Sequence, residues 1–265
     1  MFQAALITGG AKRLGKAMTL ELAKMGVDVA IHCHGSVDAA HSVADEARAL
    51  GVKAAVMQAD LLDDGAVATL VANASKALGR SLDVLVNNAS IFEYDTLESA
   101  TLENWDRHLG SNLKAPLFLS QAFARQVPKA KRETNGEATA SGVIINMIDQ
   151  RIRKLTPDFM TYTVAKYGLW GLTQTTARAL APDIRVNAIG PGPTLQGANQ
   201  SAEHFERQRK ATILERGPDE GDICTALRFI LESQSVTGQL FCIDGGQHLG
   251  WQTPDIQGPE TDGFG

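Results

Sequence analysis

Cysteine is scarce in this sequence, and long apolar runs are missing. The 265 residues contain three cysteines, Cys33, Cys224 and Cys242, which form neither a CxxC pair nor a zinc-type spacing. This usage is typical of reduced thiols, so we expect a cytoplasmic protein without disulfide bonds. A membrane helix needs roughly 18 consecutive apolar residues, and no segment approaches that length. The apolar segment at 2–7 is strand-length and follows no basic region, so we expect no signal peptide.

An excess of positive charge is also missing. The net charge is −5 and the isoelectric point is about 5.7, which argues against a large basic surface for nucleic acid or an anionic membrane. We therefore expect neither as a partner. Hydrophobic residues make up 44% of the chain and charged residues 21%, which is ordinary for a soluble globular protein. The length suits one α/β domain with a full core.

Strand-like and helix-like segments alternate along the chain. Short, nearly continuous apolar runs predict buried strands, and amphipathic stretches closed by glycines predict helices. We expect strands at 2–8, 27–33, 52–58, 82–88, 142–148, 184–190 and 239–244, and helices at 14–25, 36–50, 64–78, 102–127, 161–181, 201–214 and 219–232. Repeated β-α units of this kind predict the α/β class: a single doubly wound Rossmann-type domain with a seven-stranded parallel sheet flanked by helices.

No shift of composition divides the chain, so we expect one domain at 1–250 followed by an irregular tail at 251–265. The tail is rich in proline and glycine, and it is either loose or packed on a partner subunit. The polar segment 128–141 contains a glycine and predicts a mobile surface loop.

A glycine turn, TGGAKRLG at 8–15, joins the first predicted strand to the first helix. Glycines there let the backbone approach a pyrophosphate, which rests on the positive end of the helix. Many glycine turns only reverse the chain, but this one lies where the fold binds dinucleotides. We expect Gly9, Lys12, Arg13 and Leu14 to bind such a cofactor.

The end of the second strand, HCHGS at 32–36, has no carboxylate to bind a free ribose 2′-hydroxyl. Arg13, His34 and Ser36 can instead bind a 2′-phosphate, which favours NADP(H). His32 and His34 are two residues apart, so on a strand they would point to the same face and could bind a metal together. No further ligand cluster accompanies them, so we expect no metal. A surface histidine without a role is the remaining interpretation of His32.

Further polar residues follow the third and fourth strands. Asp60 and Leu61 lie where an adenine would bind, and Asn87 and Ala89 lie at the switch point beside a nicotinamide. Asn112 falls inside a predicted helix, an unfavourable place for asparagine unless its side chain has a function. The alternative for Asn112 is a solvent-facing residue.

Tyr162 and Lys166 are four residues apart, so they lie one turn apart on the same helix face. A neighbouring ammonium favours the phenolate, so Lys166 is expected to lower the pKa of Tyr162. Asp149 stands thirteen residues before the tyrosine, just past an apolar run. A Tyr-x-x-x-Lys pair also occurs often by chance, and only a cofactor site elsewhere in the chain gives it weight.

Together, TGGAKRLG, NNAS at 87–90, Asn112, Tyr162-x-x-x-Lys166, Pro191-Gly192 and the closing DGG at 244–246 resemble the short-chain dehydrogenase/reductase family over residues 2–249. The resemblance implies a homotetramer, a nicotinamide cofactor, and a tyrosine proton donor assisted by lysine and asparagine. It also implies that Pro191, Gly192 and Thr194 contact the cofactor.

Two departures from the family pattern are informative. Arg13 stands where a glycine is usual, and Asp149 replaces the usual serine. Both changes are similar to the pteridine reductases of this family, which include dihydromonapterin reductase-like members. The segment NASIF at 88–92 resembles their pterin-binding segment, which implies that Ser90 and Phe92 contact the substrate. Gly35 falls where those enzymes often carry an arginine for the 2′-phosphate.

A carboxylate at 149 would repel a developing alkoxide, whereas a pterin presents ring nitrogens to be protonated and amine donors to be held. We therefore predict an NADPH-dependent reductase of pterins or dihydropterins, including dihydrofolate. Asp149 and Tyr162 would relay a proton, Lys166 would hold the nicotinamide ribose, and Arg13 would reach both the cofactor phosphate and the pterin carbonyl. Phe92 would stack on the pterin, the alternative being core packing.

Two other functions stay open. One is a reductase of another carbonyl or imine substrate, and the other is a catalytically silent dinucleotide-binding or sensor protein. The polar segment 194–208 should cover the substrate, and it shows no selectivity in its residues.

Overall fold

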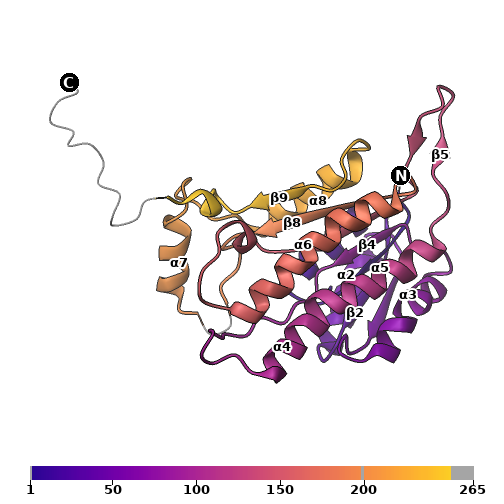
Figure 1. Cartoon of the computed structure of the whole chain (residues 1–265). Helices are drawn as coiled ribbons and strands as arrows, with labels where there is room; N and C mark the ends of the chain where they lie inside the picture. The colour runs from indigo at the N-terminus through magenta and orange to yellow at the C-terminus, as the bar shows by residue number, and fades with distance from the viewer. Residues whose placement is uncertain (1, 198–199, 252–265) are drawn as a thin grey trace.

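The computed structural model describes residues 2–197 and 200–251 of the chain. Its centre is a seven-stranded sheet in the order β3-β2-β1-β4-β7-β8-β9, and all neighbouring strands in it are parallel (Figure 1). Its strands are β1 (Ala4–Ile7), β2 (Asp28–Cys33), β3 (Ala54–Gln58), β4 (Val84–Asn87), β7 (Gly142–Met147), β8 (Ile184–Pro191) and β9 (Leu240–Ile243). The predicted α/β fold with seven parallel strands is confirmed.

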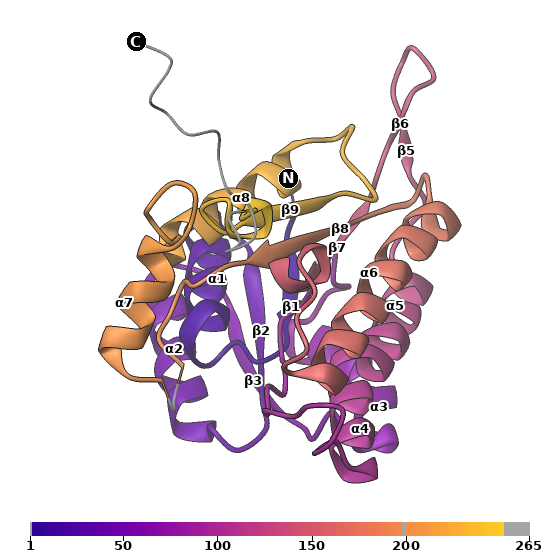
Figure 2. The same cartoon turned by 60° about the vertical axis from the view of Figure 1, so that its left-hand side comes forward.

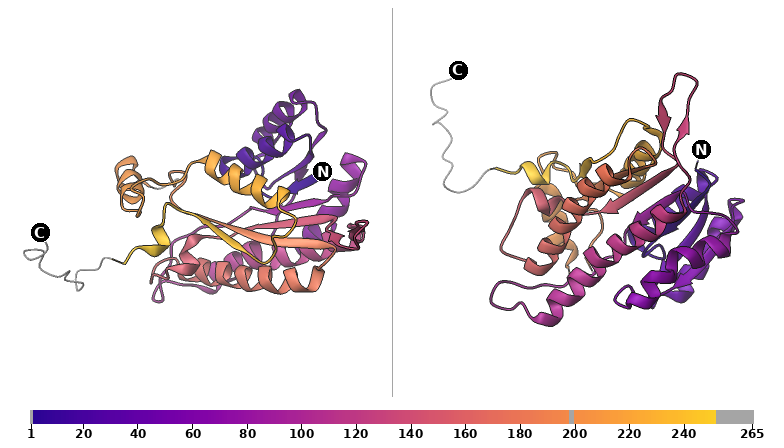
Figure 3. Two further views of the ribbon diagram at one scale, coloured as in Figure 1. Left: turned by 90° about the horizontal axis from the view of Figure 1, so that it is seen from above. Right: turned by 45° about the vertical axis from the view of Figure 1, so that its right-hand side comes forward.

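Helices cover both faces of this sheet (Figure 2). One face carries α1 (Arg13–Lys24), α2 (Val37–Ala49) and α8 (Glu220–Glu232). The other carries α3 (Asp64–Leu78), α5 (Ala115–Gln126) and α6 (Met160–Leu180). Viewed from above, the sheet lies between the two helical layers (Figure 3). The remaining helices are α4 (Leu102–Leu109) and α7 (Ala202–Lys210), and the short turns are η2 (Gln150–Arg153) and η3 (Gln247–Leu249).

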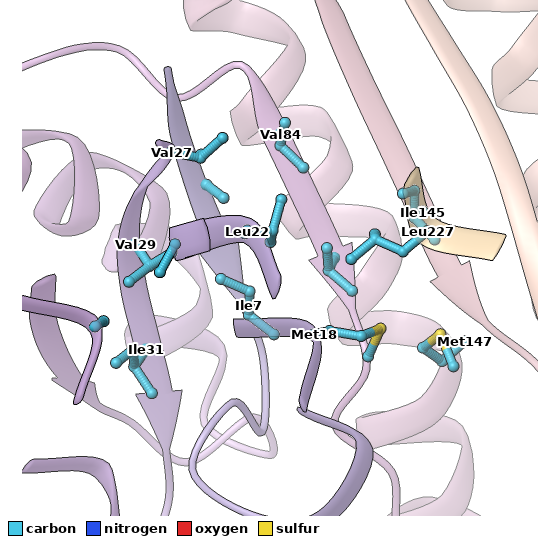
Figure 4. Close-up of a cluster of buried hydrophobic side chains, with 14 of the residues drawn as sticks. Ile7, Met18, Leu22, Val27, Val29, Ile31, Val84, Ile145, Met147 and Leu227 are labelled. Carbon is cyan, nitrogen blue, oxygen red and sulfur yellow. The ribbon is translucent and has the colours of Figure 1, made fainter. Parts of the chain in front are cut away.

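The core consists of aliphatic side chains from the strands packed against helix residues (Figure 4). Ile7, Ile31 and Val84 are fully buried against Met18 and Leu22 of α1. Successive residues of a strand point to opposite faces, so strands covered on both sides need nearly continuous apolar runs. This requirement is why the strands were recognisable in the sequence.

The predicted helix at 102–127 is wrong in one respect. It is interrupted by a π-helical turn, η1 (Gly110–Lys114), which separates α4 from α5. Such turns add a residue to the helix and recur at functional sites. The hydrophobic pattern continues on both sides of the turn, so periodicity alone did not show it.

The predicted loop at 128–141 contains a small hairpin, β5 (Lys131–Arg132) and β6 (Ala138–Thr139), which are antiparallel. Gly136 has a φ of +85°, and such a left-handed residue suits a tight turn between two strands. The hairpin projects from the body of the molecule just before β7 begins (Figure 2). It therefore lies at the end of the sheet opposite the carboxyl ends of the strands.

The topological switch point lies between β1 and β4. After β1 the chain adds β2 and β3 on one side of it, and after β3 it crosses to β4 on the other side. In open α/β sheets, ligands bind beyond the carboxyl ends of the strands at this point. In the described part of the chain, no helix combines the length and hydropathy needed to cross a membrane. Residues 252–265 of the predicted tail lie outside the described residues.

Candidate active site

Asp149, Tyr162 and Lys166 meet beyond the carboxyl end of β7. Tyr162 and Lys166 lie one turn apart on α6, and they are 5% and 2% exposed. The Tyr162 hydroxyl donates a hydrogen bond of 3.0 Å to Oδ2 of Asp149. Lys166 Nζ donates to the carbonyl of Met147 at 2.8 Å and lies 5.6 Å from the centre of the Tyr162 ring. The structure thus brings these three predicted catalytic residues together.

Burial governs the ionisation of this group. It raises the pKa of Asp149, although the Arg151 backbone N–H and charge oppose it. The pKa of Tyr162 is raised well above its ordinary value, first by burial and then by the charge and hydrogen bond of Asp149. Burial lowers the pKa of Lys166 to about 8, against the attraction of Asp149. Burial and Asp149 thus outweigh the lowering of the Tyr162 pKa that is expected from Lys166.

Asn112 holds the segment that follows β4. It lies in the π-helical turn and is 1% exposed, so the solvent-facing interpretation is wrong. Its Nδ2 donates to the carbonyl of Ile91 at 2.8 Å, and the Ile91 N–H donates to its Oδ1 at 2.9 Å. This two-point bond fixes the backbone between Ser90 and Phe92, the two predicted substrate contacts.

Phe92 is 54% exposed, so it does not serve core packing. Its ring stacks on Phe159 with centroids 4.3 Å apart and meets the edge of Tyr162 at 4.7 Å. Phe159 has a φ of +56°, which is a strained conformation for a bulky residue and is typical of functional sites. Phe159 was missed in the sequence, where its place three residues before Tyr162 was the available signal.

The glycine turn at the start of α1 has the geometry of a phosphate cradle. Gly9 has a φ of +63°, and a Cβ added to Gly15 would stand 2.0 Å from the Gly9 carbonyl oxygen. Lys12 occupies the N-cap position but provides no side-chain cap. The first N–H groups of a helix have no partner within it, so those of α1 are available to an anion.

His32 is a structural residue of this turn. It is 2% exposed, accepts the Gly9 N–H at Nδ1 over 3.0 Å, and bonds to the Ala59 carbonyl through Nε2 at 3.1 Å. Burial lowers the pKa of His32 to about 4, which leaves it neutral. Among the described residues, no group of three or more His, Cys, Asp or Glu side chains could hold a metal ion. The surface interpretation of His32 is wrong.

The other predicted adenosine contacts line the carboxyl ends of β2 and β3. His34 is exposed, with Nε2 3.9 Å from Oδ2 of Asp60, and Ser36 precedes α2. Asp60 accepts the Leu62 N–H at 2.9 Å, and Leu61 is buried. These residues share one edge of the sheet.

At the switch point, the end of β4 is bonded to the glycine turn. Asn88 donates from Nδ2 to the carbonyls of Thr8 and Gly9, at 2.9 and 3.2 Å. Asn87 points into the core and donates to Oδ1 of Asn146 at 2.8 Å. A Cβ on Gly9 would come within 3.1 Å of the Cα of Ala89. The backbones of Gly9 and Ala89 are therefore closely packed at the switch point.

The segment after β8 is bonded to β9 and to the glycine turn. Gly192 donates to the Ile243 carbonyl at 2.9 Å, and the Thr194 N–H donates to the Gly192 carbonyl at 2.8 Å. Arg13 donates to the carbonyls of Gln196 and Leu195, at 2.8 and 3.2 Å. Arg13 therefore connects the glycine turn to the segment after β8. Of the predicted covering segment 194–208, residues 198 and 199 lie outside the described residues, and Ala202–Lys210 is helix α7.

A model of the short chain dehydrogenase family matches residues 3–207. The chain belongs to this family. It is accordingly an oxidoreductase, as predicted.

Solved structures related to this short-chain dehydrogenase include FolM alternative dihydrofolate reductase 1 from Brucella suis in complex with NADP. That chain is 43% identical, with 96% of this chain and 98% of the other covered and a TM-score of 0.89. A short chain dehydrogenase from Burkholderia cenocepacia J2315 in complex with NADP is 33% identical, covering 92% and 97%, with a TM-score of 0.84. Among curated proteins, the 3-oxoacyl-(acyl-carrier-protein) reductase FabG of Staphylococcus epidermidis is 31% identical over 94% of this chain and 100% of its own.

A buried polar network that the sequence did not reveal supports the site of this short-chain dehydrogenase. His108 of α4 is fully buried, accepts the Glu93 N–H at 3.1 Å through Nε2, and bonds to Thr161 Oγ1 at 2.7 Å. Thr161 in turn donates to the carboxylate of Asp95. The network joins the segment after Phe92 to the first turn of α6, and it thereby positions Tyr162.

Proposed function

We propose that the protein is an NADPH-dependent reductase of pterins and dihydropterins, dihydrofolate included. The observation that carries this proposal is the hydrogen bond of 3.0 Å between Tyr162 and Asp149. An alkoxide forming beside this carboxylate would be repelled, whereas a ring nitrogen can accept a proton from the pair. The 43% identity to a protein described as an alternative dihydrofolate reductase supports the same substrate class.

NADP(H) is the cofactor of this proposal, and the predicted cofactor agrees with the NADP bound in the Brucella suis and Burkholderia cenocepacia relatives. The uncapped start of α1 and the close approach of Gly9 and Gly15 fit a pyrophosphate. In this proposal Arg13, His34 and Ser36 bind the 2′-phosphate, and Lys166 holds the nicotinamide ribose. When bound, NADPH supplies a hydride to the carbon next to the protonated nitrogen.

Tyr162 and Asp149 provide the proton in this proposal. With its raised pKa, Tyr162 stays protonated at neutral pH and can donate to a ring nitrogen. Asp149 accepts the hydrogen bond of the tyrosine hydroxyl, and burial raises the pKa of its carboxyl group, so this group can relay a proton to the phenolate oxygen after the transfer. Lys166 contributes a buried positive charge below its pKa of about 8 and balances the negative charge left behind.

Planar substrates suit the aromatic surface beside Tyr162. Phe92 presents a half-exposed ring that meets the tyrosine edge-on, and such a ring stacks favourably on a flat heterocycle. Ser90 is exposed beside it and offers a hydroxyl group. The guanidinium of Arg13 donates to the carbonyls of Leu195 and Gln196, in the segment proposed to cover the substrate.

A carbonyl reductase is the second candidate, favoured by the 31% identity to FabG over 94% of this chain. The two functions require different chemistry of residue 149, which lies beside the tyrosine hydroxyl. A hydroxyl group stabilises a carbonyl oxygen, and a carboxylate does so only when protonated.

NADPH oxidation measured with dihydrobiopterin, dihydromonapterin, dihydrofolate and a panel of ketones separates the two. We expect turnover with at least one pterin and little with ketones. Faster turnover of a ketone than of every pterin would favour the carbonyl reductase. NADPH binding without any turnover, unchanged in Tyr162→Phe, would indicate the silent or sensor protein.

We further propose that the chain forms a homotetramer in the cytoplasm. Large apolar side chains are exposed on α4, α5 and α6, namely Leu102, Trp105, Leu117, Phe118, Val164 and Tyr167. Exposed apolar surface of this extent marks association sites. Light scattering after gel filtration should report four chains of 28.3 kDa, and a monomer would refute the assembly while leaving the chemistry intact.

A further inference from the structure

A cavity adjoins the candidate active site and shares Phe159 with it. It has a volume of about 290 Å³, and its lining includes Gln150, Arg151, Lys154, Asp158, Phe159 and Gln208. Whole-ligand pockets usually measure roughly 300–1,000 Å³, so this cavity suits one arm of a molecule better than a complete substrate.

The cavity is connected to the reactive residues through Phe159 and Arg151. One face of the Phe159 ring stacks on Phe92, and the Arg151 guanidinium carbon lies over the ring, 5.0 Å from its centre. The Arg151 backbone N–H also donates to Oδ1 of Asp149 at 2.7 Å. A ring held beside Phe92 and Tyr162 can therefore extend a substituent past Phe159 into the cavity.

Two buried polar atoms in the wall have no hydrogen-bond partner among the described residues: Gln150 Oε1 and Arg151 Nε. Gln150 is only 8% exposed. A buried polar atom without a hydrogen-bond partner destabilises the fold by about 1–3 kcal/mol. The two atoms therefore indicate a ligand that supplies one donor and one acceptor. Gln150 Oε1 requires an N–H, and Arg151 Nε requires an oxygen acceptor.

The charge of the wall favours an anion. Within residues 2–197 and 200–251, neither Arg151 nor Lys154 forms an ion pair. Arg151 Nη1 donates to the uncharged hydroxyl of Thr156 at 2.6 Å, and the charge of Arg151 also acts on the neighbouring Asp149. Asp158 is the opposing acid, and it accepts a hydrogen bond of 3.0 Å from the Tyr94 hydroxyl.

We propose that this cavity is a subsite for a substrate arm that carries a carboxylate next to an amide N–H. Lys154 and Arg151 bind the carboxylate, and Gln150 accepts the N–H. An acidic amino acid joined through an amide has this chemistry, so the enzyme prefers dihydrofolate to dihydropterins with short uncharged side chains. The preference rests on the proposed pterin reductase function.

The test compares dihydrofolate with dihydrobiopterin, which share the reacting ring and differ in the arm. Lys154→Gln should raise the KM for dihydrofolate about tenfold, the loss expected for one charge-assisted hydrogen bond. Its kcat and both constants for dihydrobiopterin should change less than twofold. Lys154→Arg should restore the KM, and Lys131→Gln on the distant hairpin is the matched control.

Three outcomes contradict the proposal in different ways. Equal rises in KM for both substrates would show that Lys154 acts on folding or on the ring site. An unchanged KM for dihydrofolate would show that the arm lies elsewhere. Turnover of neither pterin, with NADPH still bound, would instead refute the proposed function on which the subsite depends.

Discussion

The Tyr162 hydroxyl and the Asp149 carboxylate are 3.0 Å apart and form a hydrogen bond within a buried site. They come from different elements, since Asp149 follows β7 and Tyr162 lies in the first turn of α6. Asp149 raises the pKa of Tyr162, because a buried negative charge next to a phenol disfavours the phenolate. The tyrosine hydrogen bond in turn lowers the pKa of Asp149, against the larger raising effect of burial. The proton shared by the pair therefore resides on the Tyr162 hydroxyl, from which it can be donated.

Replacing Asp149 tests the substrate assignment. In Asp149→Ser, kcat/KM for the preferred pterin should fall by about 10²–10⁴, the usual contribution of a positioned proton-transfer group. Reduction of ketones should rise at the same time, because a hydroxyl group replaces the carboxylate. Undiminished pterin reduction would refute the narrow function and leave the reductase assignment standing. Asp149→Asn separates charge from hydrogen bonding and should resemble the serine variant.

Tyr162→Phe removes the proton donor but keeps the ring that packs against Phe92. We expect kcat to fall by about 10²–10⁴, with the NADPH dissociation constant changed less than threefold. Fluorescence of bound NADPH provides the binding measurement, and single-turnover oxidation provides the rate. Loss of cofactor binding together with the rate would mean that the substitution disrupts the site as a whole.

Lys166 predicts a pH dependence of cofactor binding. Its pKa is lowered to about 8 by burial, so it carries a charge below that pH and loses it above. If the ribose hydroxyls of NADPH stabilise the ammonium, the pKa of Lys166 is higher in the NADPH complex than in the free protein. Affinity should then be constant below pH 7.5 and weaken by up to tenfold per unit above about pH 8. Lys166→Met should bind more weakly and show no such slope, and a sloping variant would assign the titration to another group.

Regular elements were predictable from the sequence because their causes are local. Buried strands require apolar runs, and Tyr162 and Lys166 share a helix face by their spacing alone. Asp149 was identified because its type departs from a family pattern at a fixed distance from the tyrosine. The π-helical turn around Asn112 was not predictable in this way, since it depends on a long-range bond to the backbone of Ile91.

The unexpected contacts of the site also depend on tertiary structure. Phe159 has a positive φ, and its N–H donates to the Asp95 carbonyl at 2.8 Å, 64 positions earlier in the chain. Arg13 turns to the carbonyls of Leu195 and Gln196, which no local pattern relates to the glycine turn. Side-chain direction at such places is decided by segments distant in sequence, so composition and periodicity carry no signal of it.

His32 predicts how stability depends on pH. Its folded pKa is about 4, below the unfolded value of 6.5, so the unfolded chain binds the proton first as the pH falls. The stabilising effect is therefore complete above pH 6.5 and is lost between pH 6.5 and 4, amounting to about 2 kcal/mol between pH 7 and pH 5. Urea unfolding at both pH values measures the change. His32→Gln should be less stable at pH 7, because the bonds to Gly9 and Ala59 are weakened, but its stability should change less with pH. An equal pH dependence in the variant would show that carboxylates, and not His32, govern acid unfolding.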